Sequence, residues 1–284
     1  MADYREHPPR ADLKGRVRCV WTFEGRDADA DQRIAPDGCA ELIVHFGAPY
    51  LERGRDGMAA PQPGVLVAGQ LTRPLHIRAA GLAGVVAVRF QPAGAWAFVG
   101  RPMQTVTDRR VALEALHGAA AAALVRAVKR AHGAEARLQL VQDYVADQIA
   151  RRPRMADPTI EACVDALAAA EGRLTLPDLQ ALSGLQPRQL QRRFLRTVGV
   201  PARTLAAILR FRRVFEALQE PGVSSWSQAA QAAGYFDHPQ LAREVRRFLG
   251  CTPSQFLASA RGLATSLVEP GQVANVQAAA RAGG

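Results

Sequence analysis

The chain has 284 residues, of which 48% are apolar, and it carries a formal net charge of +10. This length suits about two domains. The sequence contains no run of about 18 apolar residues, so it predicts no membrane-spanning helix. The N-terminal segment MADYREHPPRADLKGR is charged and has no apolar signal region, so we expect a cytoplasmic protein. The four cysteines stand at no metal-binding spacing, and we predict neither a metal ion nor a cofactor.

About the first 108 residues have the pattern of a β-rich domain. Short apolar runs such as 17–23, 41–46 and 85–90 alternate with turn sequences that contain Gly and Pro. Many short strands at this spacing favour a β-sandwich or a small barrel. Residues 109–150 then show apolar residues at helical spacing, which predicts helices that complete this domain or form a dimer interface.

The predicted fold class is α+β, with a β-rich N-terminal domain and an all-α C-terminal domain. We place a sensor or dimerisation domain at 1–150 and a linker at 151–158, where the sequence RRPR interrupts the helical pattern. The helical domain then covers 159–262. Residues 263–284 are rich in Ala and Gly and are expected to form a flexible tail.

The excess positive charge is concentrated in the last third of the chain. Residues 173–284 hold 14 basic and six acidic residues, a net charge of +8, and 188–213 hold eight arginines and no acid. A phosphate-binding surface has this electrostatic pattern. A solvated, Arg-rich surface of a protein from a GC-rich genome has the same electrostatic pattern. The small number of lysines, two in the whole chain, fits that interpretation. Charge alone therefore leaves both interpretations open.

Two copies of one short pattern occupy residues 175–256. Each copy has a hydroxyl residue (Thr175 or Ser225), a glycine nine positions later (Gly184 or Gly234), then a core leucine and a second glycine. A capping box, a glycine that ends the helix and an immediate second helix are typical of a helix-turn-helix. One copy alone would fit a packed helical hairpin, whereas two copies with shared spacing favour DNA binding.

The second helix of each copy separates into a buried and an outer face. Apolar residues recur at helical spacing and predict the buried faces, which comprise Leu190, Phe194 and Val198 in the first copy and Leu241, Val245 and Phe248 in the second. The outer face of the first copy carries arginine and glutamine, which can hydrogen-bond guanine and adenine respectively. The outer face of the second copy is less basic.

Residues 174–258 resemble the C-terminal domain of AraC/XylS-type transcription regulators. The segment AAQAAGYFDHPQLAREVRRFLGCTP at 229–253 carries the family's second motif nearly intact. The first motif matches at seven positions, namely Leu179, Gly184, Leu190, Arg192, Phe194, Gly199 and Arg210. Gln186 and Ala202 stand where the family usually has serine and proline. The resemblance implies a domain in which one long helix, at about 201–219, holds two recognition helices in adjacent major-groove segments.

The resemblance also implies which side chains contact DNA. The positions that face bases are Arg188, Gln189, Gln191, Arg192, His238, Gln240 and Arg243. The positions that we assign to phosphates are Arg196, Arg203, Arg246 and Arg247. Pro239 and Ala242 stand at reading positions and make no side-chain hydrogen bonds, so we predict that the first helix supplies most of the base readout. The expected partners are double-stranded DNA and RNA polymerase, and a homodimer is an open alternative.

The N-terminal segment is similar to a β-rich domain at the front of one AraC-like subgroup. A sandwich or barrel can enclose a small molecule, so a small-molecule effector is a further expected partner. Five polar residues are candidates for lining its site: Asp37, Glu41, His45, His76 and Arg89. A structural role explains some of them equally well, as a turn-former for Asp37 and as an ion pair for Arg89.

The predicted function is therefore sequence-specific regulation of transcription, without catalysis. Two other functions stay open at this point. One is a DNA-repair alkyl acceptor that uses Cys19 or Cys39 and carries a regulatory DNA-binding domain. The other is a packaging protein that binds any duplex, although two different recognition faces argue against it.

Overall fold

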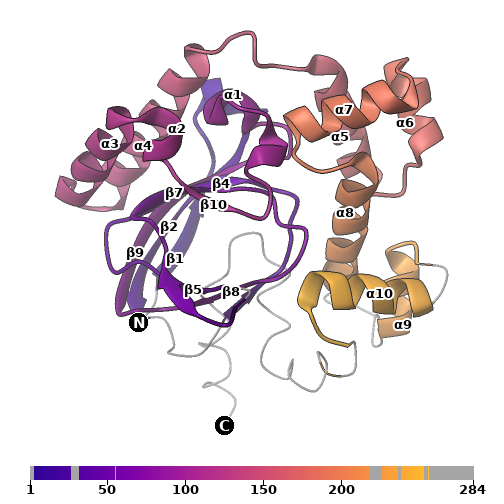
Figure 1. Ribbon diagram of the computed structural model, residues 1–284, viewed down its shortest axis with the longest axis horizontal. Coiled ribbons are helices and arrows are strands. Elements are labelled where there is room, and N and C mark those ends of the chain that lie inside the picture. The colour runs from indigo at the N-terminus through magenta and orange to yellow at the C-terminus, as the bar shows by residue number, and fades with distance from the viewer. Residues whose placement is uncertain are drawn as a thin grey trace.

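The computed structural model describes residues 3–26, 32–54, 56–217, 226–235, 238–252 and 255. The predicted tail at 263–284 and the capping residue Ser225 lie outside these residues. The described chain forms a β-rich N-terminal region followed by a helical C-terminal region (Figure 1). The predicted α+β fold class is confirmed.

The N-terminal region contains ten strands within its described residues. They are β1 (Asp3–His7), β2 (Val17–Arg26), β3 (Gln32–Ile34), β4 (Glu41–His45), β5 (Leu51–Arg53), β6 (Ala59–Pro61), β7 (Val65–Ala68), β8 (Leu75–Arg78), β9 (Leu82–Phe90) and β10 (Arg110–Ala112). One sheet has the order β1-β2-β9-β4-β7-β10 and the other β3-β8-β5-β6. The pairs are antiparallel, and β2 lies along almost the full length of β9.

The two faces of the larger sheet belong to different cores, because successive side chains of a strand point to opposite faces. Val20, Leu42 and Val88 are buried on the outer face. Trp21 and Val85 belong to the second core, on the face toward the smaller sheet. Alternation thus lets β2, β4 and β9 support two apolar layers and leaves polar positions on the inner face.

Helices cover the outer face of the larger sheet (Figure 1). The N-terminal helices are α1 (Trp96–Val99), α2 (Glu114–His117), α3 (Ala119–Arg130) and α4 (Ala134–Ala150), with short 3-10 turns at Ala11–Leu13 and Met103–Thr105. Val128 of α3 and Val141 and Val145 of α4 are buried in the same core as Val88. The helical pair therefore packs on the sheet.

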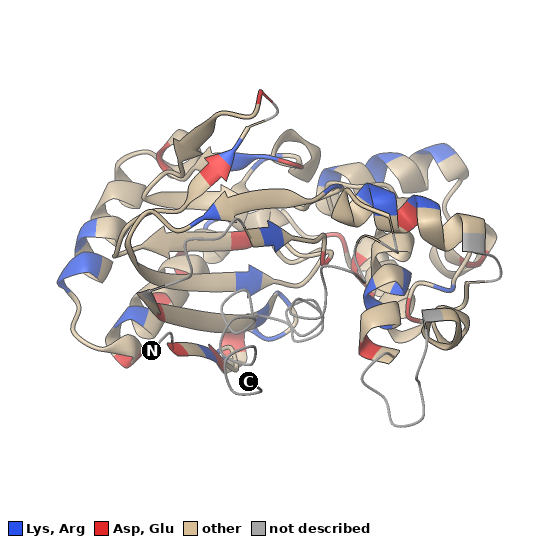
Figure 2. Ribbon diagram, turned by 90° about the horizontal axis from the view of Figure 1, so that it is seen from below, with Lys and Arg blue, Asp and Glu red and all other residues tan. Residues whose placement is uncertain are grey.

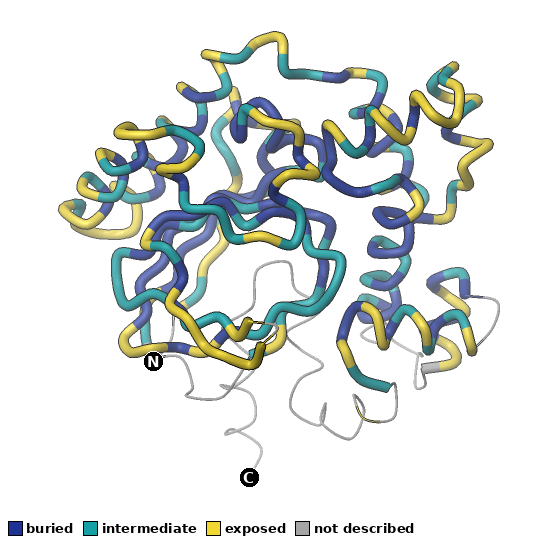
Figure 3. The backbone as a smooth tube through the Cα atoms, viewed as in Figure 1, coloured by how far each residue is buried: buried dark blue, intermediate teal, exposed yellow. Residues whose placement is uncertain are grey.

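The C-terminal region is built around one long helix. Its described helices are α5 (Pro158–Ala169), α6 (Leu176–Ser183), α7 (Pro187–Thr197), α8 (Ala202–Ala217), α9 (Trp226–Ala232) and α10 (His238–Leu249). Leu205 of α8 belongs to the core formed with α5, α6 and α7. Phe211 of the same helix belongs to the core formed with α9 and α10. α8 is consequently buried along most of its length (Figure 3) and joins the two units. No helix among the described residues is long and apolar enough to cross a membrane.

Asp157 connects α5 to α7, and its removal is expected to destabilise this region. Its carboxylate accepts a hydrogen bond from Ile160 N at 3.2 Å, which caps α5, and one from Arg193 Nε at 2.7 Å. Asp157→Ala loses the cap and the ion pair, so the free energy of unfolding should fall by about 1–3 kcal/mol in urea titration. Asp165→Ala, on the exposed face of the same helix, should change it by less than about 0.5 kcal/mol. Equal effects of the two variants would contradict the role of Asp157.

Candidate nucleic-acid interface

The first helix-turn-helix consists of α6, a turn at Gly184 and α7. Thr175 N donates to Asp178 Oδ2 at 2.7 Å and Asp178 N donates to Thr175 Oγ1 at 3.4 Å, so the predicted capping box is confirmed. Gly184 ends α6 with φ of +67°, the left-handed conformation expected of a C-terminal glycine. These local contacts fix the start of α6 and the turn that leads into α7.

Two glutamines complete the start of α7. Gln186 N donates to Gln189 Oε1 at 3.3 Å, which replaces part of the capping that a serine would provide. Gln189, predicted to face bases, is therefore engaged at the helix N-terminus. Arg188, Gln191 and Arg192 are exposed along the outer side of the helix. The predicted buried face, comprising Leu190, Phe194 and Val198, is confirmed, since all three are fully buried.

The second unit repeats this arrangement with α9, a turn at Gly234 and α10. Gly234 has φ of +81°. The predicted buried residues are again confirmed: Leu241, Val245 and Phe248. Three arginines of α10 are exposed, namely Arg243, Arg246 and Arg247, and Gln240 is half-buried. The side chain of His238 lies outside the described residues.

Half of the eight arginines at 188–213 form internal ion pairs, which sequence reasoning missed. The pairs are Arg193 with Asp157, Arg210 with Glu244 at 3.6 Å, Arg212 with Glu216 at 3.3 Å and Arg213 with Glu171 at 3.2 Å. Arg196 instead places its guanidinium 5.0 Å from the ring centre of Trp96 in α1. Arg188, Arg192 and Arg203 remain exposed (Figure 2 marks the basic positions). The cationic surface is thus narrower than the sequence suggests.

Three of the predicted ligand residues meet in one ion-pair cluster on the inner face of the larger sheet. Arg89 Nε lies 2.8 Å from Glu41 Oε1 and 3.5 Å from Asp37 Oδ2, and Arg89 Nη1 lies 3.3 Å from Glu6 Oε1. Arg89 is only 5% exposed. Burial acts to lower the pKa of Arg89, but the carboxylates of Glu41 and Asp37 outweigh it and raise that pKa well above its ordinary value. Glu6 was not among the predicted residues, because nothing in the sequence of β1 links it to Arg89.

His45 lies on the same inner face and is 1% exposed. Neither ring nitrogen forms a hydrogen bond of normal geometry within the described chain, and the ring centre lies 6.0 Å from that of Tyr50. Burial lowers the pKa of His45 to about 4, and the Gln62 side chain offsets only part of this shift. A buried imidazole whose ring nitrogens lack hydrogen bonds of normal geometry is destabilising.

His45 is expected to make the stability of the protein depend on pH. The unfolded chain binds the proton below its ordinary pKa of 6.5, whereas the folded chain does so only near 4, so stability falls as the pH is lowered between these values. His45→Gln should remove up to about 1 kcal/mol per pH unit of this slope in urea titrations. His132→Gln, the same exchange at an exposed position, is the control. An unaltered slope in His45→Gln would refute the assignment.

Hydrogen bonds between described residues join the N-terminal region to the C-terminal helices. They run from Thr107 Oγ1 to Gly199 O at 2.8 Å, from Arg212 Nη1 to Asp37 O at 3.3 Å and from Arg33 Nη1 to Cys251 Sγ at 3.0 Å. Gly38, with φ of +84°, lies so close to α8 that a Cβ atom would stand 3.1 Å from Leu205 Cδ1. The N-terminal region therefore contacts the ends of α7 and α10 as well as α8 between them.

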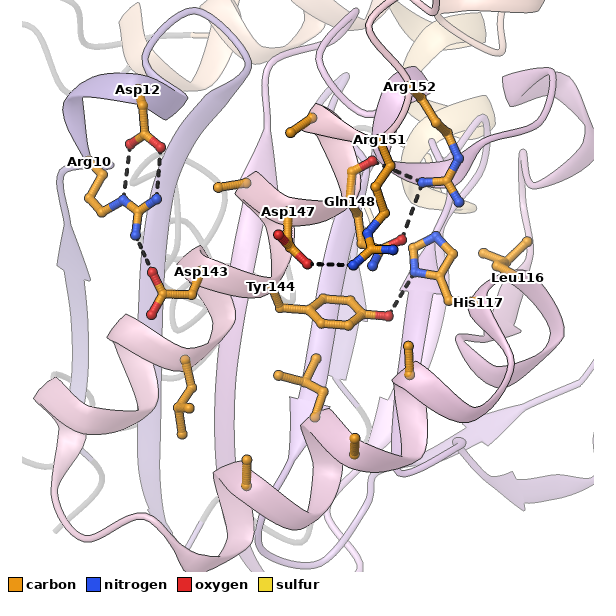
Figure 4. Close-up of a pocket in the computed structure, with 17 residues that line it drawn as sticks. Arg10, Asp12, Leu116, His117, Asp143, Tyr144, Asp147, Gln148, Arg151 and Arg152 are labelled. Carbon is orange, nitrogen blue, oxygen red and sulfur yellow. Dashed lines mark hydrogen bonds and ion pairs between the residues drawn. The ribbon is translucent and has the colours of Figure 1, made fainter.

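An open groove of about 1040 Å³ lies on the opposite side of the N-terminal region, between α2, α3 and α4 (Figure 4). Tyr144 and His117 are joined within it through Oη and Nδ1 at 2.8 Å. Its floor is otherwise formed by leucines and alanines, and charged pairs such as Arg151 with Asp147 lie at its rim. Among the described residues, no group of three or more His, Cys, Asp or Glu could hold a metal ion.

Family models match both regions of the chain. Residues 180–259 match the family model described as a helix-turn-helix domain, and residues 5–112 match a domain of unknown function, DUF6597. No curated protein matches the sequence. Similar solved structures include ToxT from Vibrio cholerae O395, with a TM-score of 0.44, 10% identity and coverage of 86% of this chain and 99% of that one. ToxT of strain SCE256 with bound unsaturated fatty acid has a TM-score of 0.42, 9% identity and coverage of 90% and 94%.

Proposed function

We propose that this chain, a DNA-binding transcription regulator with a C-terminal helix-turn-helix domain of the AraC type, reads its operator mainly through α7. The observation that carries this proposal is the outer face of α7. Arg188, Gln191 and Arg192 are exposed there and make no hydrogen bond or ion pair within the described chain. Free arginine and glutamine side chains can contact guanine and adenine bidentately, whereas the paired arginines cannot do so without breaking internal contacts.

The second unit supplies a smaller share of the readout in this proposal. Arg243 of α10 contacts a base, with His238 and Gln240 as weaker contributors, and Arg246 and Arg247 contact phosphates. Arg203 at the start of α8 adds a phosphate contact. The guanidinium of Arg196 would have to leave its position near the ring of Trp96 to bind a phosphate. We therefore expect Arg196 to contribute less to DNA affinity than the arginines without such a contact.

The N-terminal region is the proposed sensor for a small-molecule effector. The supporting observations are the buried His45, whose ring nitrogens form no hydrogen bond of normal geometry within the described chain, and the buried cluster of Asp37, Glu41 and Arg89 on the inner face of the larger sheet. Asp37 also accepts a hydrogen bond from Arg212 of α8, so a change in the cluster has a direct route to the DNA-binding helices.

A catalytic role finds no support in the cysteines. Cys19 and Cys39 are buried, and burial raises the pKa of Cys19 to about 12 and that of Cys39 to about 11. Both thiols stay protonated at neutral pH and are poor nucleophiles. We therefore propose that the chain is not an alkyl acceptor, and methyl transfer to either thiol would overturn this.

The proposal includes two protein partners, a second copy of this chain and RNA polymerase. A second copy is proposed to occupy the groove between α3 and α4, because the rim of this groove carries both signs of charge and can match an antiparallel copy of itself. Ala123→Arg would then shift the protein to monomers in sedimentation experiments. RNA polymerase is the proposed partner for activation at the promoter, in the cytoplasm.

Selection of duplexes from a random pool by the full-length protein tests the function. We expect one enriched sequence that binds at least about 1,000-fold more tightly than its scrambled version. Equal binding of the enriched and scrambled duplexes would overturn sequence-specific regulation and favour a packaging protein. Arg203→Ala should weaken both duplexes alike and reduce the salt dependence by about one unit.

A further inference from the structure

A single guanidinium connects the two helix-turn-helix units. Arg210 of α8 donates from Nη1 to the carbonyl oxygen of Gly172 at 2.6 Å, and its Nη2 lies 3.6 Å from Glu244 Oε1 of α10. Gly172 lies in the turn between α5 and α6, just before the first helix-turn-helix, and Glu244 belongs to the recognition helix of the second. The side chains of Arg210 and Glu244 are only 19% and 14% exposed, so water screens their interaction weakly.

The second oxygen of Glu244 is also engaged. Tyr235, which follows the turn glycine Gly234, donates its hydroxyl to Glu244 Oε2. Tyr235 is 6% exposed, and its burial and the Glu244 carboxylate together raise its pKa, so the phenol remains a donor at neutral pH. Glu244 is therefore held from both sides, by α8 and by the turn that precedes α10.

The turn that carries Gly172 packs closely against α8. Gly172 has φ of +76°, and a Cβ atom there would stand 2.2 Å from the carbonyl oxygen of Ala206 in α8. Its neighbour Glu171 lies 3.2 Å from Arg213 Nε of the same helix. The turn therefore packs against α8, which positions the carbonyl oxygen of Gly172 to accept the hydrogen bond from Arg210.

The contact has a consequence for the outer face of α10. Glu244 directly follows Arg243, and successive residues of a helix point about 100° apart. A rotation of α10 about its axis that separated Glu244 from Arg210 would also change the direction in which the side chain of Arg243 points. The length of α8 sets the distance between the units, but it does not set the rotation of α10 about its own axis.

We propose that Arg210 and Glu244 are positioning residues that fix the rotation of α10 relative to α7, so that the protein accepts only one spacing between the two DNA segments that these helices read. This proposal rests on the proposed function. Neither residue contacts DNA. Their effect is on which spacing is bound, whereas Arg192 and Arg243 determine which bases are bound.

The test measures binding to the selected duplex and to versions with one base pair inserted or deleted between the two contacted segments. For the wild-type protein, the changed spacing should weaken binding by about tenfold or more. In Glu244→Gln, which keeps the shape but removes the charge, this ratio should fall to about threefold or less. Glu216→Gln is the matched control, because Glu216 pairs with Arg212 within α8 and does not reach α10. It should keep the wild-type ratio.

The ratio of two affinities is independent of the fraction of folded protein, so a less stable variant still gives a valid result. If Glu244→Gln does not fold, Tyr235→Phe, which removes only one hydroxyl, and Arg210→Lys, which has one nitrogen in place of the two that contact Gly172 and Glu244, should show the same fall. A wild-type ratio in the folded variants would overturn the proposal while the selected duplex is still bound. Failure of the wild-type protein to prefer the selected duplex would instead overturn the proposed function.

Discussion

Arg192→Ala is expected to weaken binding of the selected duplex by about 5- to 150-fold, which corresponds to about 1–3 kcal/mol. Arg192 is exposed on α7 and makes no hydrogen bond or ion pair within the described chain. A guanidinium in that position can form two hydrogen bonds with one guanine, and alanine forms none. Affinity for a scrambled duplex should fall by less than about threefold, since one charge is lost. Titration of both duplexes in a mobility-shift experiment measures the difference.

Arg130→Ala is the control for this prediction. Arg130 is an exposed arginine at the end of α3, in the N-terminal region, so its replacement removes the same charge far from α7. It should leave both affinities nearly unchanged. An equal loss on the selected and scrambled duplexes in Arg192→Ala would assign this residue to a phosphate and leave Arg188 and Gln191 as the base readers.

The features of the interface that sequence predicted are those fixed by local geometry. Leu190, Phe194 and Val198 recur every four residues, and a helix brings such residues to one side whatever surrounds it. Gly184 and Gly234 end their helices in the left-handed conformation, which glycine adopts without a steric penalty. Helical periodicity and turn-forming glycines therefore predict both helix-turn-helix units without knowledge of any tertiary contact.

The distribution of free charge depended instead on contacts between distant segments. Asp157 lies 36 residues from Arg193, and Glu244 lies 34 residues from Arg210 in the sequence. Neither acid falls within 188–213, so this segment looks uniformly cationic. The packing of α5 on α7 and of α10 on α8 neutralises Arg193 and Arg210, whereas Arg212 pairs with Glu216, which lies four residues further along the same helix.

On the inner face of the larger sheet, too, some features follow from the local sequence and others only from contacts between distant segments. Glu41 and His45 lie four residues apart on β4, so alternation predicts that they share a face. Arg89 is opposite Glu41 in the register of β4 and β9, and this register follows from the fold rather than from either strand alone. Alternation thus places Glu41 and His45 on one face, whereas the neutralisation of Arg89 by Glu41 and Asp37 follows only from the assembled sheet. Whether they hold an effector stays a prediction.

Phe211→Ala is expected to have the largest effect on stability, about 3–5 kcal/mol. The ring of Phe211 is 1% exposed and lies between α8 and α10, with ring centres 5.0 Å from Phe215 and 5.1 Å from Phe248. Alanine would leave a cavity in the core that holds α10 against α8. Urea titration followed by circular dichroism should show this loss, and the matched Phe211→Leu should lose less than about 1.5 kcal/mol, because its volume is closer to that of phenylalanine.

The same substitution separates the contributions of the two recognition helices. The core of α5, α6 and α7 shares no residue with the core that contains Phe211, so α7 should keep its reading face when α10 loses its support. The variant should then retain a preference for the DNA segment read by α7 but become indifferent to changes in the segment read by α10. Loss of both preferences together would show that the two units fold as one, because α8 would then transmit the damage along its whole length.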